Sequence, residues 1–218
     1  MSSKDKQIQY ILDSGIVAII RADRSDALFD VVQAIHEGGV RAIEITLTTP
    51  GALDVITACA DRLQGQVLIG AGTVLDPETA RAAILAGAEY IVAPTLNPSV
   101  IETCRRYSKI AIPGALTPTE ILTAWECGAD LVKVFPATAF GPGYFRDVKA
   151  PLPQIDLIPT GGVTLENTGD FIAAGAAAVA VGSNLVDKQA VADRNYGILT
   201  DTARKYVEAV QQARQDTA

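Results

Sequence analysis

The stretch EGGVRAIEIT, residues 37–46, joins a helix-like segment that ends in glycine to a short apolar run. The same pattern returns three times, as LAGAEYIVAP at 85–94, ECGADLVKVFP at 126–136 and AAGAAAVAVG at 173–182. A glycine readily takes the left-handed conformation that stops a helix. The repeat therefore predicts a helix, a terminating glycine and then a strand in each segment. The terminating glycines are Gly39, Gly87, Gly128 and Gly175.

Eight apolar runs of strand length follow one another along the chain. They lie near residues 16–20, 41–46, 67–71, 90–93, 109–112, 130–135, 155–159 and 178–182. Runs that are apolar on both faces are typical of parallel strands covered by helices. Alternation with helices predicts one (β/α)8 TIM barrel domain spanning residues 1–218. A doubly wound open sheet is the alternative, but no glycine-rich dinucleotide fingerprint follows the first strand.

Four dipeptides predict helix starts, because each places a capping side chain before a proline suited to the first turn. These are Thr49-Pro50, Asp76-Pro77, Asn97-Pro98 and Thr117-Pro118. Thr117 with Glu120 also has the spacing of a capping box. The segment from Asp193 to Gln215 is expected to form a last amphipathic helix.

Composition narrows the class of protein. The net charge of −7 argues against nucleic acid or an anionic membrane as a partner, although a local pocket for a small phosphate remains possible. No secretory signal or membrane-spanning run is evident. Three cysteines, an odd number, fit thiols in a reducing cytoplasm. With the single histidine His36, a zinc site is not expected, and the interpretation requires no cofactor.

Two charged residues fall inside the predicted strands. Five residues after each terminating glycine stand Glu44, Val92, Lys133 and Ala180. These positions belong to alternate strands, whose side chains fill one layer of a barrel interior. Glu44 and Lys133 are therefore expected to share a layer and to point into the barrel.

This pair of charged residues has three interpretations. A buried ion pair is one, although such pairs contribute little to stability because desolvation offsets the attraction. In a second, Lys133 points outward between helices. The third is a Schiff base: an apolar site favours the neutral, nucleophilic amine of a lysine, which attacks a ketone, while a nearby carboxylate moves protons. We favour the third.

The segments that follow the predicted strands supply further candidates. GAGTV places Thr73 at the barrel mouth, and APTLNP places Pro94 there. Glycine-rich turns after the seventh and eighth strands of such barrels bind phosphate through backbone N–H groups. The candidates for this role are Gly161, Gly162, Gly182 and Ser183.

Four motifs in this order resemble one family. They are EITLTTPGA at 44–52, GAGTVLDPE at 70–78, LVKVFPA at 131–137 and PTGGVTLEN at 159–167. The chain from about Ile8 onward resembles the class I aldolases that act on 2-keto-3-deoxy-6-phosphogluconate (KDPG) and 4-hydroxy-2-oxoglutarate (KHG). The resemblance implies an aldehyde-lyase of the Entner–Doudoroff route, cytoplasmic and commonly a homotrimer.

The resemblance also implies roles. Lys133 becomes the Schiff-base lysine and Glu44 the general acid and base. Thr73 and Pro94 are expected at the pyruvyl end of the substrate. Thr160, Gly161, Gly162, Gly182 and Ser183 are expected around its far end and phosphate.

One position departs from the family pattern. Many members carry an arginine four residues after the glutamate, where this chain has Thr48. Some relatives instead carry an arginine at the end of the first strand, as in VAIIRAD at 17–23. We therefore expect Arg21 to bind the substrate carboxylate, with a surface arginine as the alternative.

The expected reaction is cleavage of KDPG to pyruvate and glyceraldehyde 3-phosphate, and also of KHG to pyruvate and glyoxylate. A galactonate-type aldolase or an oxaloacetate decarboxylase using the same lysine is the alternative. A metal-dependent barrel enzyme is disfavoured by the lone His36. A regulatory phosphate-binding barrel is disfavoured by the pairing of Glu44 with Lys133. The expected partner is thus a small 2-keto acid, with a phosphorylated substrate as the first expectation.

Overall fold

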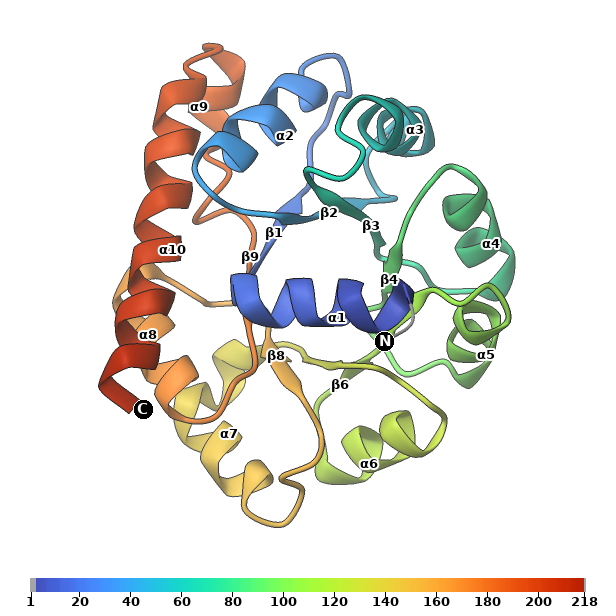
Figure 1. Ribbon diagram of the computed structural model, residues 1–218, viewed down its shortest axis with the longest axis vertical. Helices are drawn as coiled ribbons and strands as arrows, with labels where there is room; N and C mark the ends of the chain where they lie inside the picture. The colour runs from blue at the N-terminus through green and yellow to red at the C-terminus, as the bar shows by residue number, and fades with distance from the viewer. Residues whose placement is uncertain (1–2, 218) are drawn as a thin grey trace.

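The computed structural model describes residues 3–217 and shows parallel strands alternating with helices (Figure 1). The strands are β1 (Ile16–Ile20), β2 (Ala42–Thr46), β3 (Leu68–Gly72), β4 (Tyr90–Val92), β5 (Ile110–Ile112), β6 (Gly114–Ala115), β7 (Val132–Val134), β8 (Leu157–Pro159) and β9 (Val179–Val181). The helices are α1 (Ser3–Ser14), α2 (Leu28–Glu37), α3 (Ala52–Arg62), α4 (Pro77–Leu85), α5 (Pro98–Arg106), α6 (Pro118–Glu126), the short 3₁₀ helix η1 (Ala137–Ala139), α7 (Gly141–Lys149), α8 (Leu165–Ala173), α9 (Lys188–Ala192) and α10 (Tyr196–Thr217). All eight predicted strands are present, each within two residues of its predicted ends.

The strands form two parallel sheets rather than the single closed sheet expected from the sequence. One sheet has the order β5-β4-β3-β2-β1-β9 and the other β6-β7-β8. The fifth predicted strand corresponds to β5, and the short strand β6, which was not predicted, follows it after Pro113, a residue with no N–H to donate to a ladder. On the other side, a bridge between Thr160 and Ala180 connects the two sheets. The strands are arranged in a ring with α2–α8 and α10 outside it (Figure 1).

Most of the predicted helix boundaries are confirmed. The four terminating glycines all have φ between 95° and 109°, the left-handed region in which a side chain would be strained. Asp76, Asn97 and Thr117 cap α4, α5 and α6 as predicted, and Thr117 forms its capping box with Glu120.

The prediction at Thr49-Pro50 was wrong. Helix α3 starts later, at Ala52, after Gly51 in the left-handed conformation. The hydroxyl of Thr49 accepts a hydrogen bond from the backbone N–H of Ala22 instead, at 3.2 Å. This bond holds the loop after β2 against the loop after β1.

Buried side chains form two clusters, one inside the ring of strands and one between strands and helices. Along the strands, residues of the inner cluster alternate with residues of the outer cluster, as the two-residue period of a strand requires. On β1, for example, Val17 faces the inner cluster and Ala18 the outer cluster.

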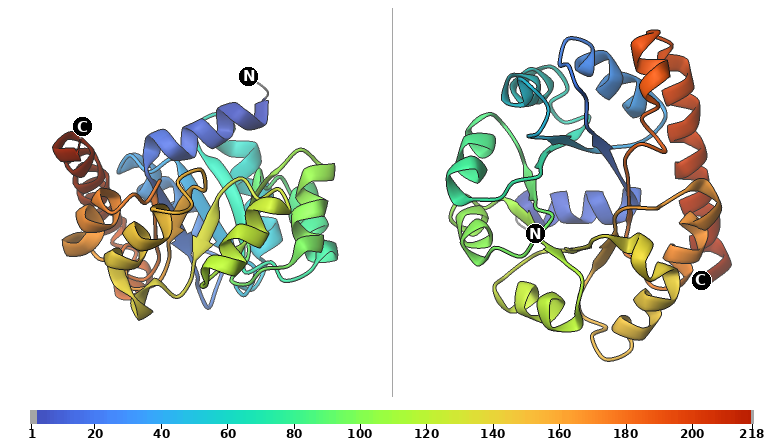
Figure 2. Two further views of the ribbon diagram at one scale, coloured as in Figure 1. Left: turned by 90° about the horizontal axis from the view of Figure 1, so that it is seen from below. Right: turned by 180° about the vertical axis from the view of Figure 1, so that it is seen from behind.

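Helix α1 closes one end of the ring, which the sequence did not predict. Ile11 is fully buried in the inner cluster, and Ile8 and Leu12 pack against it. The helix lies across the end of the ring (Figure 2, left). The functional site is therefore expected at the opposite end, where the parallel strands finish.

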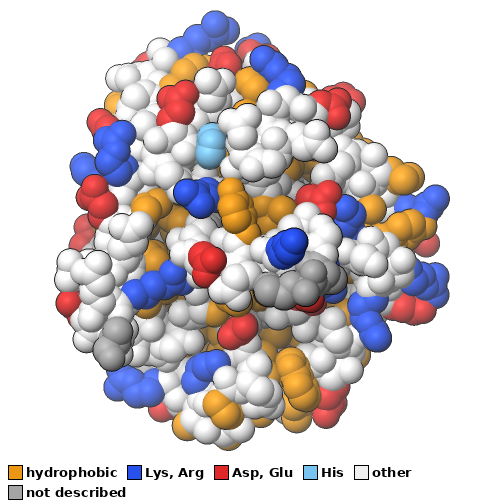
Figure 3. Space-filling view, in the orientation of Figure 1, with side chains coloured by type: hydrophobic (Ala, Val, Ile, Leu, Met, Phe, Trp, Pro, Cys, Tyr) orange, Lys and Arg blue, Asp and Glu red, His pale blue; other side chains and the backbone are white. Residues whose placement is uncertain are grey.

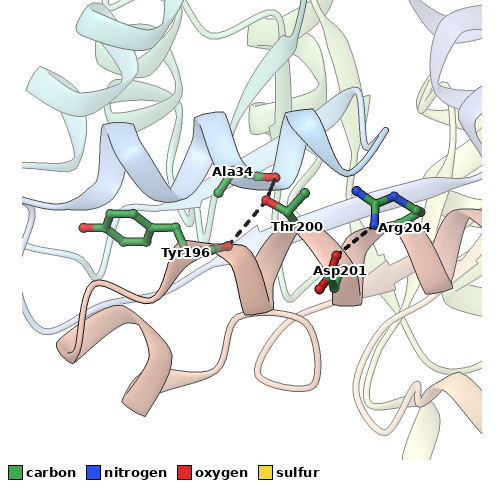
Figure 4. Close-up of polar contacts among 5 residues, drawn as sticks. All are labelled: Ala34, Tyr196, Thr200, Asp201 and Arg204. Atoms are coloured by element: carbon green, nitrogen blue, oxygen red, sulfur yellow. Dashed lines mark hydrogen bonds and ion pairs between the residues drawn. The ribbon is translucent and has the colours of Figure 1, made fainter.

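The long helix α10 packs against α2 and α8, so the predicted last helix is confirmed. The hydroxyl of Thr200 donates a hydrogen bond to the carbonyl oxygen of Ala34 in α2 at 2.9 Å (Figure 4). An added Cβ at Gly38 would lie 2.5 Å from the Cβ of Ala203, so the end of α2 and α10 meet closely.

Acidic and basic side chains are interspersed over the face on which α1 lies (Figure 3). Within residues 3–217, no helix combines the length and apolar character needed to cross a bilayer.

Candidate active site

A pocket of about 500 Å³ opens where the strands end. Every site residue predicted from the sequence lines it. These residues are Arg21, Glu44, Thr73, Pro94, Lys133, Thr160, Gly161, Gly162, Gly182 and Ser183. They come from the ends of seven strands and the loops that follow, so the fold gathers residues far apart in the chain into one cavity.

Lys133 and Glu44 lie at the base of this pocket. Lys133 is 7% exposed and Glu44 is 1% exposed. Both also line a smaller cavity of about 10 Å³, and Val92 and Ala180 are among its other lining residues, so the predicted inward direction of these four side chains is confirmed. A cavity of this size fits a single water molecule.

The geometry of Lys133 removes two of the interpretations made from the sequence. Its side chain lines the interior pocket rather than running outward between helices. Among residues 3–217, no ion pair within 4.0 Å links it to Glu44. Its Nζ lies 5.3 Å from the ring centroid of Phe135, and its backbone N–H donates to the carbonyl oxygen of Pro113 at 2.9 Å. The amine is thus held beside the cavity without a carboxylate partner.

The buried carboxyl of Glu44 has the properties of a group that transfers protons. Burial raises the pKa of its carboxyl, and the charges of Lys133 and Arg21 oppose that rise. Within the described chain its Oε1 has no hydrogen-bond partner. The carboxyl lies over Gly72, where an added Cβ would come within 1.7 Å of Oε1. A carboxyl with a raised pKa gains and loses protons closer to neutral pH, as a general acid and base must.

Arg21 follows directly after β1 and lines the same pocket as Glu44 and Lys133. Thr48 also lines the pocket, and its hydroxyl lies 3.2 Å from that of Thr46. The pocket wall near Lys133 therefore has an arginine from β1, and a neutral threonine at the position after β2.

The loops after β8 and β9 form the part of the pocket wall between β7 and β1. Gly161 and Gly162 have φ of 88° and 72°, and an added Cβ at Gly162 would lie 2.1 Å from the Cγ2 of Thr138. Thr164 caps α8 directly after this turn. The amide of Asn184 donates to the carbonyl oxygen of Val163 at 2.7 Å and so joins the two loops. Consecutive left-handed glycines before a helix start leave backbone N–H groups free to face an anion.

Thr73 has φ of 60°, an uncommon conformation for a β-branched residue. The turn is fixed because the backbone N–H of Val74 donates to the carbonyl oxygen of Val92 at 3.1 Å. Backbone strain of this kind costs of order 1–3 kcal/mol and gathers at functional sites. The fold thus holds Thr73 at the mouth of the pocket at some cost in stability.

Eight lining residues were not predicted as site residues: Ile19, Thr48, Phe135, Val163, Ala180, Asn184, Val186 and Lys188. Phe135 is 38% exposed at the pocket wall although it ends an apolar strand. Its place in the motif LVKVFPA, two residues after Lys133, was a signal that could have found it. Lys188 follows the motif VGSN by four residues, and nothing in its surroundings distinguished it from a surface lysine.

Comparison with known proteins gives the family of the chain. The family model described as KDPG and KHG aldolase matches residues 8–202. The chain belongs to the KDPG and KHG aldolase family. Its relatives are carbon–carbon lyases.

Individual members of the family give the extent of the match. The chain is 38% identical over 197 residues to the 2-dehydro-3-deoxy-6-phosphogalactonate aldolase of Escherichia coli K12, covering 90% of this chain and 96% of the relative. It is 31% identical over 203 residues to the KHG/KDPG aldolase of the same organism, covering 92% and 95%. A solved structure described as native KDPGal superimposes with a TM-score of 0.86 at 37% identity, covering 92% of this chain and 96% of that one.

Proposed function

We propose that the chain is a class I aldolase that cleaves KDPG through a Schiff base on Lys133. The observation that carries the proposal is a nearly buried amine at the base of a 500 Å³ pocket, near an equally buried carboxyl but not paired with it. An unpaired amine is available to attack a carbonyl. The match to an aldolase family supports the reaction class.

The reaction begins with attack of the neutral Lys133 amine on C2 of the keto acid. Glu44 gives a proton to the departing hydroxide, and water leaves as the iminium forms. Glu44 then takes the proton of the C4 hydroxyl, the C3–C4 bond breaks, and its electrons pass into the iminium. The aldehyde departs and an enamine of pyruvate remains. A proton returns to C3, water adds to C2, and the C2–nitrogen bond breaks to release pyruvate.

The remaining residues hold the substrate. Arg21 binds the carboxylate, since its guanidinium fork suits two parallel hydrogen bonds. Thr73 and Pro94 border the pyruvyl end. The phosphate occupies the opposite side of the pocket, against Thr160, Gly161, Gly162, Gly182 and Ser183. The left-handed glycine turn supports this end for the phosphate.

Borohydride trapping tests the proposal. Incubation with pyruvate and borohydride should add one pyruvyl unit per chain, and peptide mapping should place it on Lys133. Lys149 and Lys109 serve as internal controls, because Lys149 donates to the carbonyl oxygens of Pro153 and Ile155 and Lys109 pairs with Glu89. Labelling of either control instead of Lys133, or no labelling, would refute the assignment.

The galactonate epimer is a second candidate substrate. It is favoured by the 38% identical relative, which is named for that substrate, and by the KDPGal structure. A panel of both phosphorylated keto acids, KHG and oxaloacetate, compared by kcat/KM, ranks the candidates. The gluconate proposal predicts the highest kcat/KM for KDPG, and a higher value for the epimer or for oxaloacetate would replace it.

Three broader features belong to the proposal. The two sheets act as one closed (β/α)8 barrel and a single domain, supported by the bridge between Thr160 and Ala180. The protein acts in the cytoplasm as a homotrimer. Exposed large apolar side chains on α4, α6 and after η1 support an interface: Leu85, Trp125 and Phe140. Sedimentation equilibrium tests the trimer.

A further inference from the structure

The inner cluster contains a tyrosine whose hydroxyl has no hydrogen-bond partner. Tyr90 is completely buried and belongs to the inner cluster. Its hydroxyl is one of four buried side-chain polar atoms in residues 3–217 without a partner, together with Glu44 Oε1, Thr160 Oγ1 and the Tyr196 hydroxyl. An unpaired buried hydroxyl is destabilising, and a phenylalanine at position 90 would avoid that cost. Such a group calls for an explanation.

Only Gly70 separates Tyr90 from Glu44 on the inner face. In the strand register, Gly70 of β3 pairs with Glu44 of β2 on one side and with Tyr90 of β4 on the other. The ring of Tyr90 fills the space above Gly70, because an added Cβ there would lie 2.3 Å from ring atoms Cε2 and Cζ. Neighbouring strands are about 4.8 Å apart, so Glu44 and Tyr90 flank Gly70 on the inner face, one strand away on either side.

The carboxyl of Glu44 now lies over Gly72, one step nearer the mouth than Gly70. A hydrogen bond between Glu44 and Tyr90 therefore requires rotation about the side-chain bonds of Glu44, which turns the carboxyl toward Tyr90. No other side chain stands between them on β3, since positions 70 and 72 are both glycine.

Tyr90 keeps its proton in this environment. Burial, and then the charge of Glu44, raise the pKa of the Tyr90 phenol well above its usual value. The titratable groups that face Glu44 are Lys133 on β7, Arg21 after β1 and Tyr90 on β4. Of these, Tyr90 is neutral and can donate its O–H whatever the state of the amine.

We propose that Tyr90 is a positioning residue for Glu44, whose hydroxyl donates a hydrogen bond to the carboxylate in the steps where Glu44 is ionised. The inference rests on the proposed function, in which Glu44 takes the C4 hydroxyl proton. Donation to the carboxylate stabilises its charged form and opposes the effect of burial. The hydroxyl thereby keeps enough Glu44 ionised to act as a base near neutral pH.

Tyr90→Phe removes the donor and keeps the ring. Without the donor, the acid limb of the kcat profile should move to higher pH by about one unit. KM should stay within about twofold, because Tyr90 does not line the pocket that receives substrate. Trapping of pyruvate on Lys133 should persist, and the melting temperature should be no lower than that of the wild type.

Tyr196→Phe is the matched control. It removes another unpaired buried hydroxyl, but at the start of α10 outside the ring of strands (Figure 4). This variant should leave the pH profile of kcat unchanged. The same shift in both variants would assign the effect to general packing and overturn the inference.

Three further results distinguish failure of the role of Tyr90 from failure of the proposed function. A Tyr90→Phe profile that superimposes on the wild type, with normal trapping, would overturn the role of Tyr90 alone. A markedly lower melting temperature for Tyr90→Phe would assign a structural partner to the hydroxyl and overturn it too. Failure of the wild type to trap pyruvate would refute the proposed function itself.

Discussion

Gly72→Ala should inactivate the enzyme without unfolding it. An added Cβ would lie 1.7 Å from Glu44 Oε1, 2.4 Å from its Cδ and 2.6 Å from its Cγ, whereas an ordinary contact begins at 3.4 Å. The backbone at Gly72 is not in the left-handed region, so alanine is compatible with the chain path. The clash is therefore with the end of a side chain, which can rotate away.

The size of the effect follows from that displacement. To avoid the added Cβ, the carboxyl of Glu44 must move by more than ~1 Å. A misplacement of only ~1 Å typically lowers the rate by about 10²-fold. Complete loss of a positioned acid and base costs about 10²–10⁴-fold, which sets the upper bound. We expect kcat for cleavage to fall by about 10²–10³-fold.

The assay combines three measurements on one preparation. Steady-state cleavage gives kcat, borohydride trapping with pyruvate reports imine formation on Lys133, and thermal unfolding reports the fold. Gly143→Ala is the control, because an added Cβ there meets nothing within 4 Å. A Gly72→Ala enzyme with kcat within threefold of the wild type would contradict the placement of Glu44 as the proton carrier.

The remaining predictions concern four side chains of the pocket. Lys133→Arg should abolish trapping, since a guanidinium stays protonated and cannot attack; trapped product in that variant would exclude Lys133. Glu44→Gln should slow cleavage by about 10²–10⁴-fold. The same variant should raise the melting temperature at neutral pH but not at acid pH. Burial raises the pKa of the Glu44 carboxyl above its ordinary 4.5, so the stability of the wild type falls as the pH rises from 4.5 through the higher folded pKa. Thermal scans across pH should show the melting temperatures of the two proteins converging at low pH. Arg21→Ala should raise KM for all 2-keto acids by an amount equivalent to roughly 1.5–3 kcal/mol, and Thr48→Ala by much less; a loss confined to phosphorylated substrates would move Arg21 to the phosphate end. Ser183→Ala should raise KM for KDPG about tenfold but leave KHG nearly unchanged, and equal losses on both would place the phosphate elsewhere.

The strand pattern and the gathering of the site residues could be predicted because their signals are local. Each terminating glycine needs a left-handed backbone whatever its neighbours are, so it fixes the start of the next strand. Counting from Gly39 and Gly128 then gave the inward direction of Glu44 and Lys133, which both cavities confirm. The parallel arrangement brought their strand ends to one side.

Features that depend on the fit between side chains were not predictable. Nothing in GAGTV indicates that the carboxyl of Glu44 lies over Gly72 or that the ring of Tyr90 lies over Gly70. The separation of β5 from β6 at Pro113 depends on which neighbour each strand pairs with. The conformation of Thr73 opposes its intrinsic preference and is imposed by tertiary contacts.

Helix α1 was also beyond local reasoning, because a short amphipathic helix is stabilised mainly by what it packs against. Ile11 finds its place only when the ends of several strands are assembled around it. The sequence of the N-terminal segment therefore does not by itself indicate where α1 packs in the fold.

Helix α1 covers the end of the ring opposite to the pocket that contains Lys133 and Glu44. Under the proposed function, the pyruvyl end of a substrate therefore enters this pocket first and lies deepest, since Lys133 and Glu44 lie at its base. The aldehyde lies between pyruvate and the entrance and must leave before it. In the direction of synthesis, pyruvate must bind before the aldehyde. Under the proposed function, the helix that covers one end of the ring thus predicts a compulsory kinetic order at the other, and product inhibition patterns should show pyruvate as the last product released.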